Sequence, residues 1–345
     1  MNSETATDTV TDKQAGLDVA IDQAQTGAPE DYLPVDVGLL RAGPERGFDL
    51  YQRMDRQMVL FCAHSYPLRN KALRRLHQED VQTIYVPLDQ GPLISQYVES
   101  ILLEVVQDEK IAVERRARVL RTSARTIMAD IQTDPMSHDM LRRGTALANA
   151  TVDFVSKDPA AVKALVAVFA KDYYTYTHCV HTCVLGVALY KYLISPKPAM
   201  LRRFGLGMLL HDAGKSLIDS KALNKPTRLT PEEFEHVKRH PQLGWSIVSG
   251  HGAEDELIRQ PVLHHHEKLD GSGYPEGLSG SQIGDAARVA AIVDVYDALT
   301  CSRAYRPALT DDQAVKIMTE QMTPSHLDGE MLATFCRARR SFGLC

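Results

Sequence analysis

Histidine is distributed unevenly along this chain of 345 residues. Nine of its 13 histidines fall between residues 178 and 266. A neutral imidazole offers a lone pair to a metal ion at neutral pH, and its second ring nitrogen can be held by a neighbour. Carboxylates accompany these histidines, among them Asp212, Glu267, Asp294 and Asp297. The pattern favours a fold that brings distant segments together around a metal centre.

Length and composition predict a protein of two globular units joined by a helix. The chain is longer than a comfortable single domain, and its 44% hydrophobic and 24% charged residues are typical of globular proteins. A net charge of −5 offers no overall field for a nucleic-acid polymer. The six cysteines lack CxxC spacing, so we expect free thiols. The chain shows neither a membrane-length apolar run nor an export signal, which predicts a cytoplasmic location.

The N-terminal half divides into three predicted segments. Residues 1–30 contain few large apolar residues and are expected to form a disordered leader. Short β-like runs punctuated by Gly and Pro, with a helix near 69–77, predict a small α+β regulatory domain over 31–96. A helical connector is expected over 97–155. Its first part belongs to one long, exposed amphipathic helix from about 94 to 128, through which the protein could form a homodimer.

Residues 156–345 are predicted to form an all-α bundle, which makes the protein mainly α. Thr230 and Glu233 have the spacing of a helix capping box, and Thr310 and Gln313 repeat the device. Gly271–Gly284 contains too many glycines for a helix. We expect this segment to be a flexible wall over the site.

The pair His211-Asp212 would mean little alone, but its context is specific. The chain resembles the HD-GYP family of metal-dependent phosphohydrolases in six ordered blocks over about 165 to 340. The blocks are TYTHCV at 175, LLHDAGK at 209, KPTRLT at 225, EEFEHVKRHPQLG at 232, HHEKLDGSGYP at 265 and DVYDALTCSRAYRP at 294. The segment 31–96 also resembles the small domain often found ahead of HD-GYP domains.

The resemblance implies two metal ions that share one carboxylate. The ligands of the first ion would be His178, His211, Asp212 and Asp294, and those of the second would be Asp212, His240, His265 and His266. Imidazole and carboxylate together suit iron or manganese. Some family members bind a third ion through a Glu four residues before the first histidine. Tyr174 occupies that position here, so we expect two ions.

Resemblance also implies the reaction and its substrate contacts. The substrate would be the bacterial second messenger cyclic di-GMP, hydrolysed to pGpG and/or GMP by a water that two metal ions activate. Asp212 and Lys215 would be catalytic, with Lys215 also approaching the substrate phosphate. Arg303, Arg306, Asp270 and Tyr274 would complete the substrate contacts. Glu267 is expected to accept an imidazole N–H.

Three alternatives stay open at this point. The domain could act as an HD-type phosphohydrolase on another nucleotide. It could be a cyclic di-GMP receptor with vestigial activity, whose GYP loop, the Gly-rich segment Gly271–Gly284, docks diguanylate-cyclase-type signalling proteins. A diiron oxygenase is the third alternative. His236 imitates a helical ligand pair with His240 but is expected to face solvent, and His181 is expected in the core or behind the ligands.

Overall fold

The computed structural model describes residues 31–43, 46–55, 57–158, 160–169, 175–223, 225, 227–301 and 307–344. The chain divides into two compact units, Met1–Ile111 and Ala112–Cys345. Across the described residues, no helix combines the length and the apolar character needed to cross a membrane.

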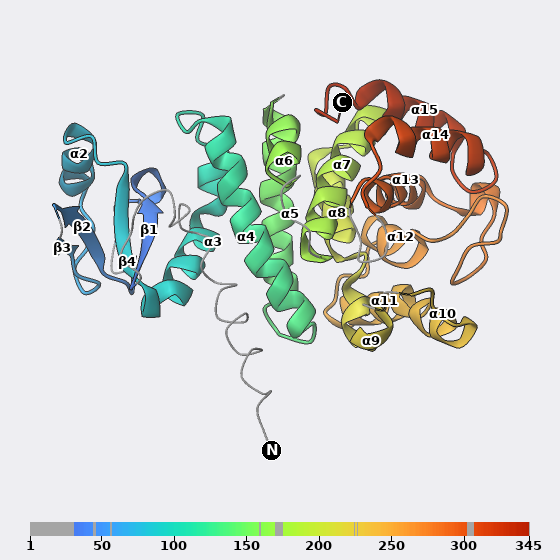
Figure 1. Ribbon diagram of the computed structural model, residues 1–345, viewed down its shortest axis with the longest axis horizontal. Coiled ribbons are helices and arrows are strands. Elements are labelled where there is room, and N and C mark those ends of the chain that lie inside the picture. The colour runs from blue at the N-terminus through green and yellow to red at the C-terminus, as the bar shows by residue number, and fades with distance from the viewer. Residues whose placement is uncertain are drawn as a thin grey trace, which may run out of the picture. The chain divides into compact units, whose positions relative to one another are not determined.

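The first unit contains a four-stranded antiparallel sheet in the order β1, β4, β2, β3 (Figure 1). Its elements are β1 (Tyr32–Asp36), β2 (Leu50–Met54), β3 (Gln57–Cys62), α2 (Asn70–Gln78), β4 (Thr83–Pro87) and α3 (Gly91–Gln107), with short 3-10 turns at η1 (Val37–Leu39) and η2 (Leu88–Gln90). Leu33 and Val35 of β1 pair with Val86 and Ile84 of β4, and all four side chains are buried. These apolar pairs anchor the sheet to the core, and the predicted α+β character is confirmed.

The expected single exposed helix from 94 to 128 is wrong. The chain forms α3, then a turn, and then α4 from Val113 to Thr133. In the turn, Asp108 accepts hydrogen bonds from the N–H groups of Lys110 and Ile111. Such Asx turns compete with helix and need neither Gly nor Pro. Both helices also bury an apolar face in their own unit, so neither is an exposed rod.

The second unit is built of helices, apart from one isolated bridge between Asp270 and Ser279 in the described chain. Its elements are α4 (Val113–Thr133), α5 (Met140–Lys157), α6 (Ala161–Phe169), α7 (Thr175–Ile194), α8 (Pro198–Leu210), η3 (Ala213–Leu217), α9 (Ser220–Leu223), α10 (Pro231–Val237), α11 (His240–Gly250), α12 (Glu256–His264), η4 (Gly280–Gln282), α13 (Asp285–Thr300), α14 (Asp311–Gln321) and α15 (Gly329–Ala338). This confirms the all-α prediction for the C-terminal half. Both predicted capping boxes are present, at the starts of α10 and α14.

Helix α8 lies at the centre of this unit and packs against α5, α7 and α12 (Figure 1). Gly207 permits the close approach of α12, because a Cβ there would lie 2.9 Å from the Cα of Ile258. Gly214 does the same just after α8, where a Cβ would overlap the carbonyl oxygen of His240. These small residues bring the end of α8, the end of α12 and the start of α11 to one place.

Candidate metal centre

The structure brings the predicted ligands together from five separate segments. His178 lies on α7, His211 and Asp212 follow α8, His240 begins α11, His265 and His266 follow α12, and Asp294 lies on α13. Their ligand atoms form two main groups. One group contains His178, His211 and Asp294, and the other contains His240, His265 and His266. We call them cluster 1 and cluster 2.

Cluster 1 combines imidazole and carboxylate. The Nε2 atoms of His178 and His211 lie 3.3 Å apart. The Oδ1 atom of Asp294 lies 3.1 Å from Nε2 of His178 and 4.0 Å from Nε2 of His211. His211 is fully buried, whereas His178 and Asp294 retain slight exposure. The three ligand atoms thus converge on one point at the edge of the core.

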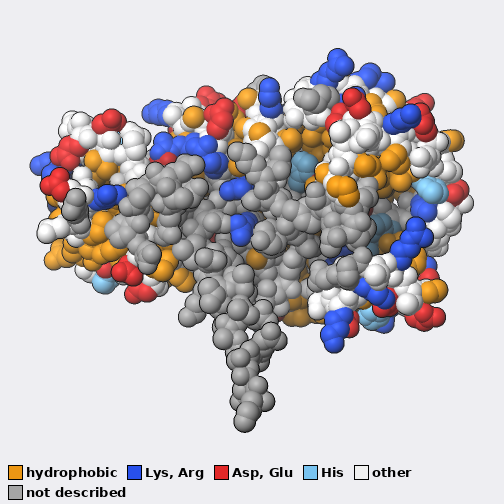
Figure 2. All heavy atoms as spheres, viewed as in Figure 1, with side chains coloured by type: hydrophobic (Ala, Val, Ile, Leu, Met, Phe, Trp, Pro, Cys, Tyr) orange, Lys and Arg blue, Asp and Glu red, His pale blue; other side chains and the backbone are white. Residues whose placement is uncertain are grey.

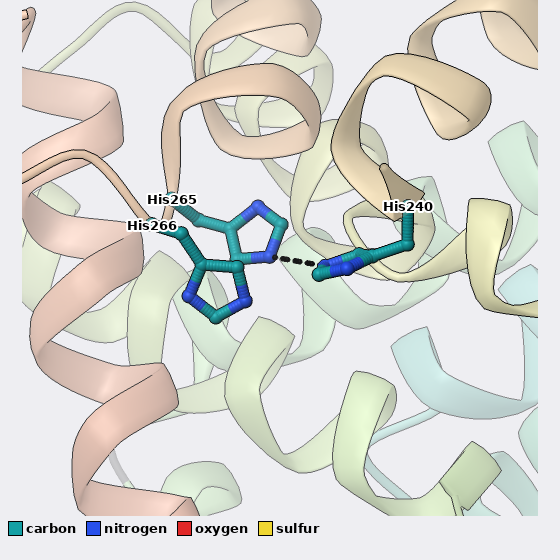
Figure 3. Close-up of side chains that lie close together, drawn as sticks. All are labelled: His240, His265 and His266. Atoms are coloured by element: carbon teal, nitrogen blue, oxygen red, sulfur yellow. Dashed lines mark hydrogen bonds between the residues drawn. The ribbon is translucent and has the colours of Figure 1, made fainter. Parts of the chain in front are cut away.

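Cluster 2 consists of three histidines whose rings face one another, as Figure 3 shows. The Nε2 atoms of His240 and His265 lie 3.2 Å apart, which the dashed line in Figure 3 marks. The rings of His265 and His266 lie side by side, with centroids 4.1 Å apart. Adjacent residues reach the same point because α12 ends at His264 and the chain turns there.

The carboxylate of Asp212 lies between the two clusters. Its Oδ2 atom is 3.6 Å from Nε2 of His178 and 3.5 Å from Nε2 of His211. Its Oδ1 atom faces the other way, 3.4 Å from Nε2 of His240 and 3.8 Å from Nε2 of His265. This Oδ1 atom is buried and has no hydrogen-bond partner. A buried anionic oxygen without a donor is costly unless a cation neutralises it.

Hydrogen bonds at the far side of the rings set the tautomers. His211, His240 and His265 each direct Nδ1 at a backbone carbonyl, those of Met208, Val237 and Pro261, at 2.7–2.9 Å. A carbonyl accepts but cannot donate, so Nδ1 carries the proton and Nε2 presents a lone pair. The facing Nε2 atoms of His240 and His265 then repel each other unless a cation lies between them. This arrangement fits a divalent metal ion.

Burial keeps cluster 2 neutral. Burial, together with the nearby charge of Lys215, lowers the pKa of His240 to about 3 and that of His266 to about 4. Burial also holds the pKa of His265 well below its usual value, aided by His266. All three imidazoles therefore keep their lone pairs at pH 7, as metal ligands must.

Cys179 lies close to this centre, with Sγ near the ligand atoms of His211 and Asp212. Burial raises the pKa of its thiol well above the usual value, and Asp212 raises it further. A protonated thiol is a poor ligand. Cys179 and Cys183 are both buried and form no disulfide, in line with the expected free thiols.

Lys215 is the cation closest to the carboxylate of Asp212 among the described residues. Lys215 lies in η3, one turn beyond Asp212, and its Nζ atom is 2.6 Å from Oδ2 of Asp212. Burial alone would lower the pKa of Lys215, but Asp212 and Asp294 outweigh it and raise the pKa. Lys215 is therefore a protonated ammonium beside the centre. It can interact with a further anionic group in addition to Asp212 and Asp294.

Asp297 is a residue whose role the sequence did not reveal. It is buried on α13, one turn after Asp294, and accepts hydrogen bonds from Nδ1 of His178 at 2.5 Å and from Nδ1 of His181. It orients His178 as the backbone carbonyls orient the other rings. In the sequence, the i+3 spacing between Asp294 and Asp297 could have indicated this role, because it places both carboxylates on one face of a helix. The expectation that His181 lies behind the ligands is confirmed.

Glu267 does not accept an imidazole N–H, contrary to expectation. Its buried carboxylate accepts three consecutive backbone N–H groups of the GYP loop, those of Glu276, Gly277 and Leu278, at 2.7–3.1 Å. It therefore ties the loop to the residue that directly follows His266. Together with the bridge from Asp270 to Ser279, this makes the segment a hydrogen-bonded turn rather than a flexible wall.

The expected substrate contacts have different positions. The ring of Tyr274 lies against His266, with centroids 4.8 Å apart. Asp270 is exposed, and its carboxylate accepts a hydrogen bond from the N–H of Ser272 within the loop. His236 faces solvent, as expected. Arg303, Arg306, Tyr174 and the leader 1–30 lie outside the described residues.

Comparisons with known proteins agree with this geometry. A family model described as an HD domain matches residues 189–331. The chain is 34% identical over 281 residues to cyclic di-GMP phosphodiesterase PA4108 of Pseudomonas aeruginosa, covering 77% of this chain and 67% of that protein. It is 34% identical over 193 residues to 3'3'-cGAMP-specific phosphodiesterase 3 of Vibrio cholerae, covering 52% of this chain and 40% of that protein.

A solved structure shares the fold. Bd1817, an HDG"Y"P protein from Bdellovibrio bacteriovorus, superposes with a TM-score of 0.63 at 20% identity, over 90% of this chain and 100% of that one. The helical fold and the paired His-Asp clusters define an HD domain with a divalent metal site. Within that class, the GYP loop and the relatives place the chain more narrowly. The protein belongs to the HD-GYP family.

Proposed function

We propose that this protein hydrolyses cyclic di-GMP to pGpG and/or GMP at a centre of two divalent metal ions. The observation that carries the proposal is the carboxylate of Asp212, which directs one oxygen at each cluster and leaves Oδ1 without a donor. A carboxylate placed in this way can bridge two cations. The P. aeruginosa relative named above supports the same substrate for this chain.

The proposed ligands of the first ion are His178, His211, Asp212 and Asp294. Those of the second ion are Asp212, His240, His265 and His266. Imidazole and carboxylate oxygen suit iron or manganese, whereas structural zinc sites favour thiolate. We expect two ions per chain because Tyr174 stands where a third site would need a carboxylate. Bound divalent ions supply Lewis-acid activation of water and of the phosphodiester.

The chain's own residues then position the substrate and balance its charge. Lys215 holds its ammonium beside Asp212, where it can stabilise the negative charge that builds up on a phosphoryl oxygen. Tyr274 forms one wall of the centre by packing on His266. Asp297 keeps the ring of His178 oriented and its Nδ1 proton engaged. Asp270 shapes the loop, and Arg303 and Arg306 are proposed to contact the phosphates.

The rest of the chain has a proposed regulatory role. We propose that residues 31–96 form a sensing domain, that 97–155 is a helical connector through which two chains associate, and that 156–345 is the phosphohydrolase domain. The GYP loop is a candidate surface for diguanylate-cyclase-type partners. A cytoplasmic location is supported by the cysteines, which form no disulfide in the described part of the chain and suit a reducing compartment.

One experiment tests the central proposal. Protein purified without oxygen is analysed for metal content, then incubated with cyclic di-GMP, and the products are separated by chromatography. We expect two ions per chain and production of pGpG or GMP that ceases after chelation. Tight nucleotide binding without product would indicate a receptor. Turnover confined to unrelated nucleotides would indicate a broader phosphohydrolase, and three tightly bound ions would contradict the two-ion centre.

A further inference from the structure

A small group of side chains on α10 lies next to the metal centre and has no role in the function described so far. Phe234, Glu235 and Lys238, which we call the α10 rim, occupy the last turn of α10 and its C-terminal cap. The Nζ atom of Lys238 lies over the ring of Phe234, 5.5 Å from its centroid, and 2.7 Å from Oε1 of Glu235. An aromatic face, a carboxylate and an ammonium are thus held within one turn.

The α10 rim is continuous with the metal centre through Tyr274. The Nζ atom of Lys238 also lies 5.6 Å from the centroid of Tyr274, so the ammonium is flanked by two aromatic rings. Tyr274 in turn packs on His266 of cluster 2. A molecule whose phosphate occupies the metal centre would therefore extend past Tyr274 toward the α10 rim.

Two of the three side chains of the α10 rim are open to solvent. Phe234 is 47% exposed, and the side chain of Glu235 is 68% exposed. Over α9 and α10, Figure 2 shows basic, acidic and hydrophobic side chains side by side at the surface. An exposed ion pair contributes little to folding stability. Folding stability therefore places little constraint on this combination, and its groups can bind a ligand at little cost in stability.

The three groups match the chemistry of guanine. Every base can stack on an aromatic ring, which Phe234 presents. Enzymes that act on nucleotides read a base by hydrogen bonds to its Watson–Crick edge. The guanine edge presents the O6 acceptor next to the N1–H and N2–H donors, which suits an ammonium beside a carboxylate. The corresponding edge of adenine presents N1, an acceptor that a carboxylate repels.

We propose that the α10 rim binds a guanine base of the cyclic dinucleotide and selects against adenine at that position. Phe234 stacks on the base, Glu235 accepts from N1–H and N2–H, and Lys238 donates to O6. This inference rests on the proposed function. It addresses a question that the comparisons raise, because the relatives include enzymes named for cyclic di-GMP and others named for 3'3'-cGAMP.

The test compares substrates rather than rates alone. The full chain loaded with manganese is assayed for kcat/KM on cyclic di-GMP and on cyclic di-AMP. We expect Glu235→Gln to reduce the preference for cyclic di-GMP by about tenfold, because the glutamine amide can also pair with adenine. Phe234→Leu should lower kcat/KM for both substrates by about tenfold and leave the preference unchanged.

The control is Glu320→Gln, which removes a similarly exposed carboxylate from α14. It should leave activity and preference at the parent values, and all variants should keep the parent metal content and thermal stability. A preference within twofold of the parent in Glu235→Gln would overturn the inference. If the parent hydrolyses neither nucleotide, the proposed function fails. In that case, the preference is measured from the dissociation constants of the two nucleotides. If the parent and Glu235→Gln bind each nucleotide with the same affinity, this inference is overturned as well.

Discussion

The two clusters of the metal centre place histidines in different electrostatic surroundings. In cluster 1, His178 lies beside Asp294 and donates to Asp297. In cluster 2, the three imidazoles lie beside one another, and Asp212 is the carboxylate that they share with cluster 1. The difference shows in the pKa values. Burial favours neutral rings in both, but Asp297 and Asp294 raise the pKa of His178 to about 10, whereas that of His240 falls to about 3.

This contrast shows that one residue, Asp212, has a carboxylate oxygen facing each of the two clusters. Cluster 1 has negative charge of its own to offset a cation, through Asp294 and Asp297. Cluster 2 depends on Asp212 for the same purpose. We therefore expect the second ion, in cluster 2, to be lost more easily than the first. Substitution of the shared carboxylate Asp212 should affect both ions, whereas substitution of Asp297 should affect the first ion.

The largest effect is expected from Asp212→Ala, which removes the carboxylate that both clusters share. Turnover should fall by at least about 1,000-fold and both ions should be lost, with the second ion lost more completely. Elemental analysis and product chromatography measure the two outcomes. His236→Ala, on the exposed face of α10, is the control and should behave as the parent. Retention of two ions by Asp212→Ala would show that each cluster binds its ion independently.

Asp297→Asn should separate the clusters. It removes the carboxylate behind His178 while leaving Asp212 and cluster 2 intact, so it should weaken the first ion by about 10–100-fold. Titration with a competing chelator resolves the two affinities. If the second ion weakened equally, the clusters would be coupled through more than Asp212. Unchanged affinity for both ions would mean that Asp297 serves only the packing of α7 on α13.

Lys215→Ala should reduce catalysis without removing metal. Its ammonium is assigned to the charge of the substrate, and its loss should lower kcat by about 100-fold. Both ions should remain, because the Oδ2 atom of Asp212 then no longer accepts a hydrogen bond from Lys215 that competes with metal binding. Kinetics and elemental analysis are measured on the same preparation. Metal loss as severe as in Asp212→Ala would place Lys215 in the support of the centre instead.

The smallest expected effect is on the pH dependence of stability after chelation, and its sign differs between His240 of cluster 2 and His178 of cluster 1. The folded-state pKa of His240, about 3, lies below the usual 6.5, so its contribution is present above pH 6.5 and is lost as pH falls toward 3. The folded-state pKa of His178, about 10, lies above 6.5, so its contribution is complete below 6.5 and is lost as pH rises through 10.

Thermal unfolding of the chelated protein from pH 5 to pH 10 tests this difference. His240→Gln should flatten the loss of stability on the acid side, and His178→Gln should flatten the loss on the alkaline side. Identical profiles for the two variants would contradict the difference between the clusters.

Much of the fold could be predicted from local patterns. The capping boxes at Thr230 and Thr310 mark the starts of α10 and α14, and the β-like runs before residue 90 became the sheet. The break between α3 and α4 could not be predicted in the same way. It depends on a turn at Asp108 and on each helix burying its apolar face in its own unit, and neither appears in helix propensity.

The candidate ligands could be named from the sequence, because imidazole and carboxylate residues occur there in ordered motifs that resemble those of the HD-GYP family. Tertiary structure decided how they meet. Gly207 and Gly214 let helix backbones approach closely enough for His211, Asp212 and His240 to share one centre. It also decided which acidic residues support the ligands. Asp297 lies behind His178, while Glu267 binds loop N–H groups instead of an imidazole. Asp297 and His178 are 119 residues apart in sequence, and Glu267 and Glu276 are 9 residues apart. Only packing determines which donor a buried carboxylate contacts.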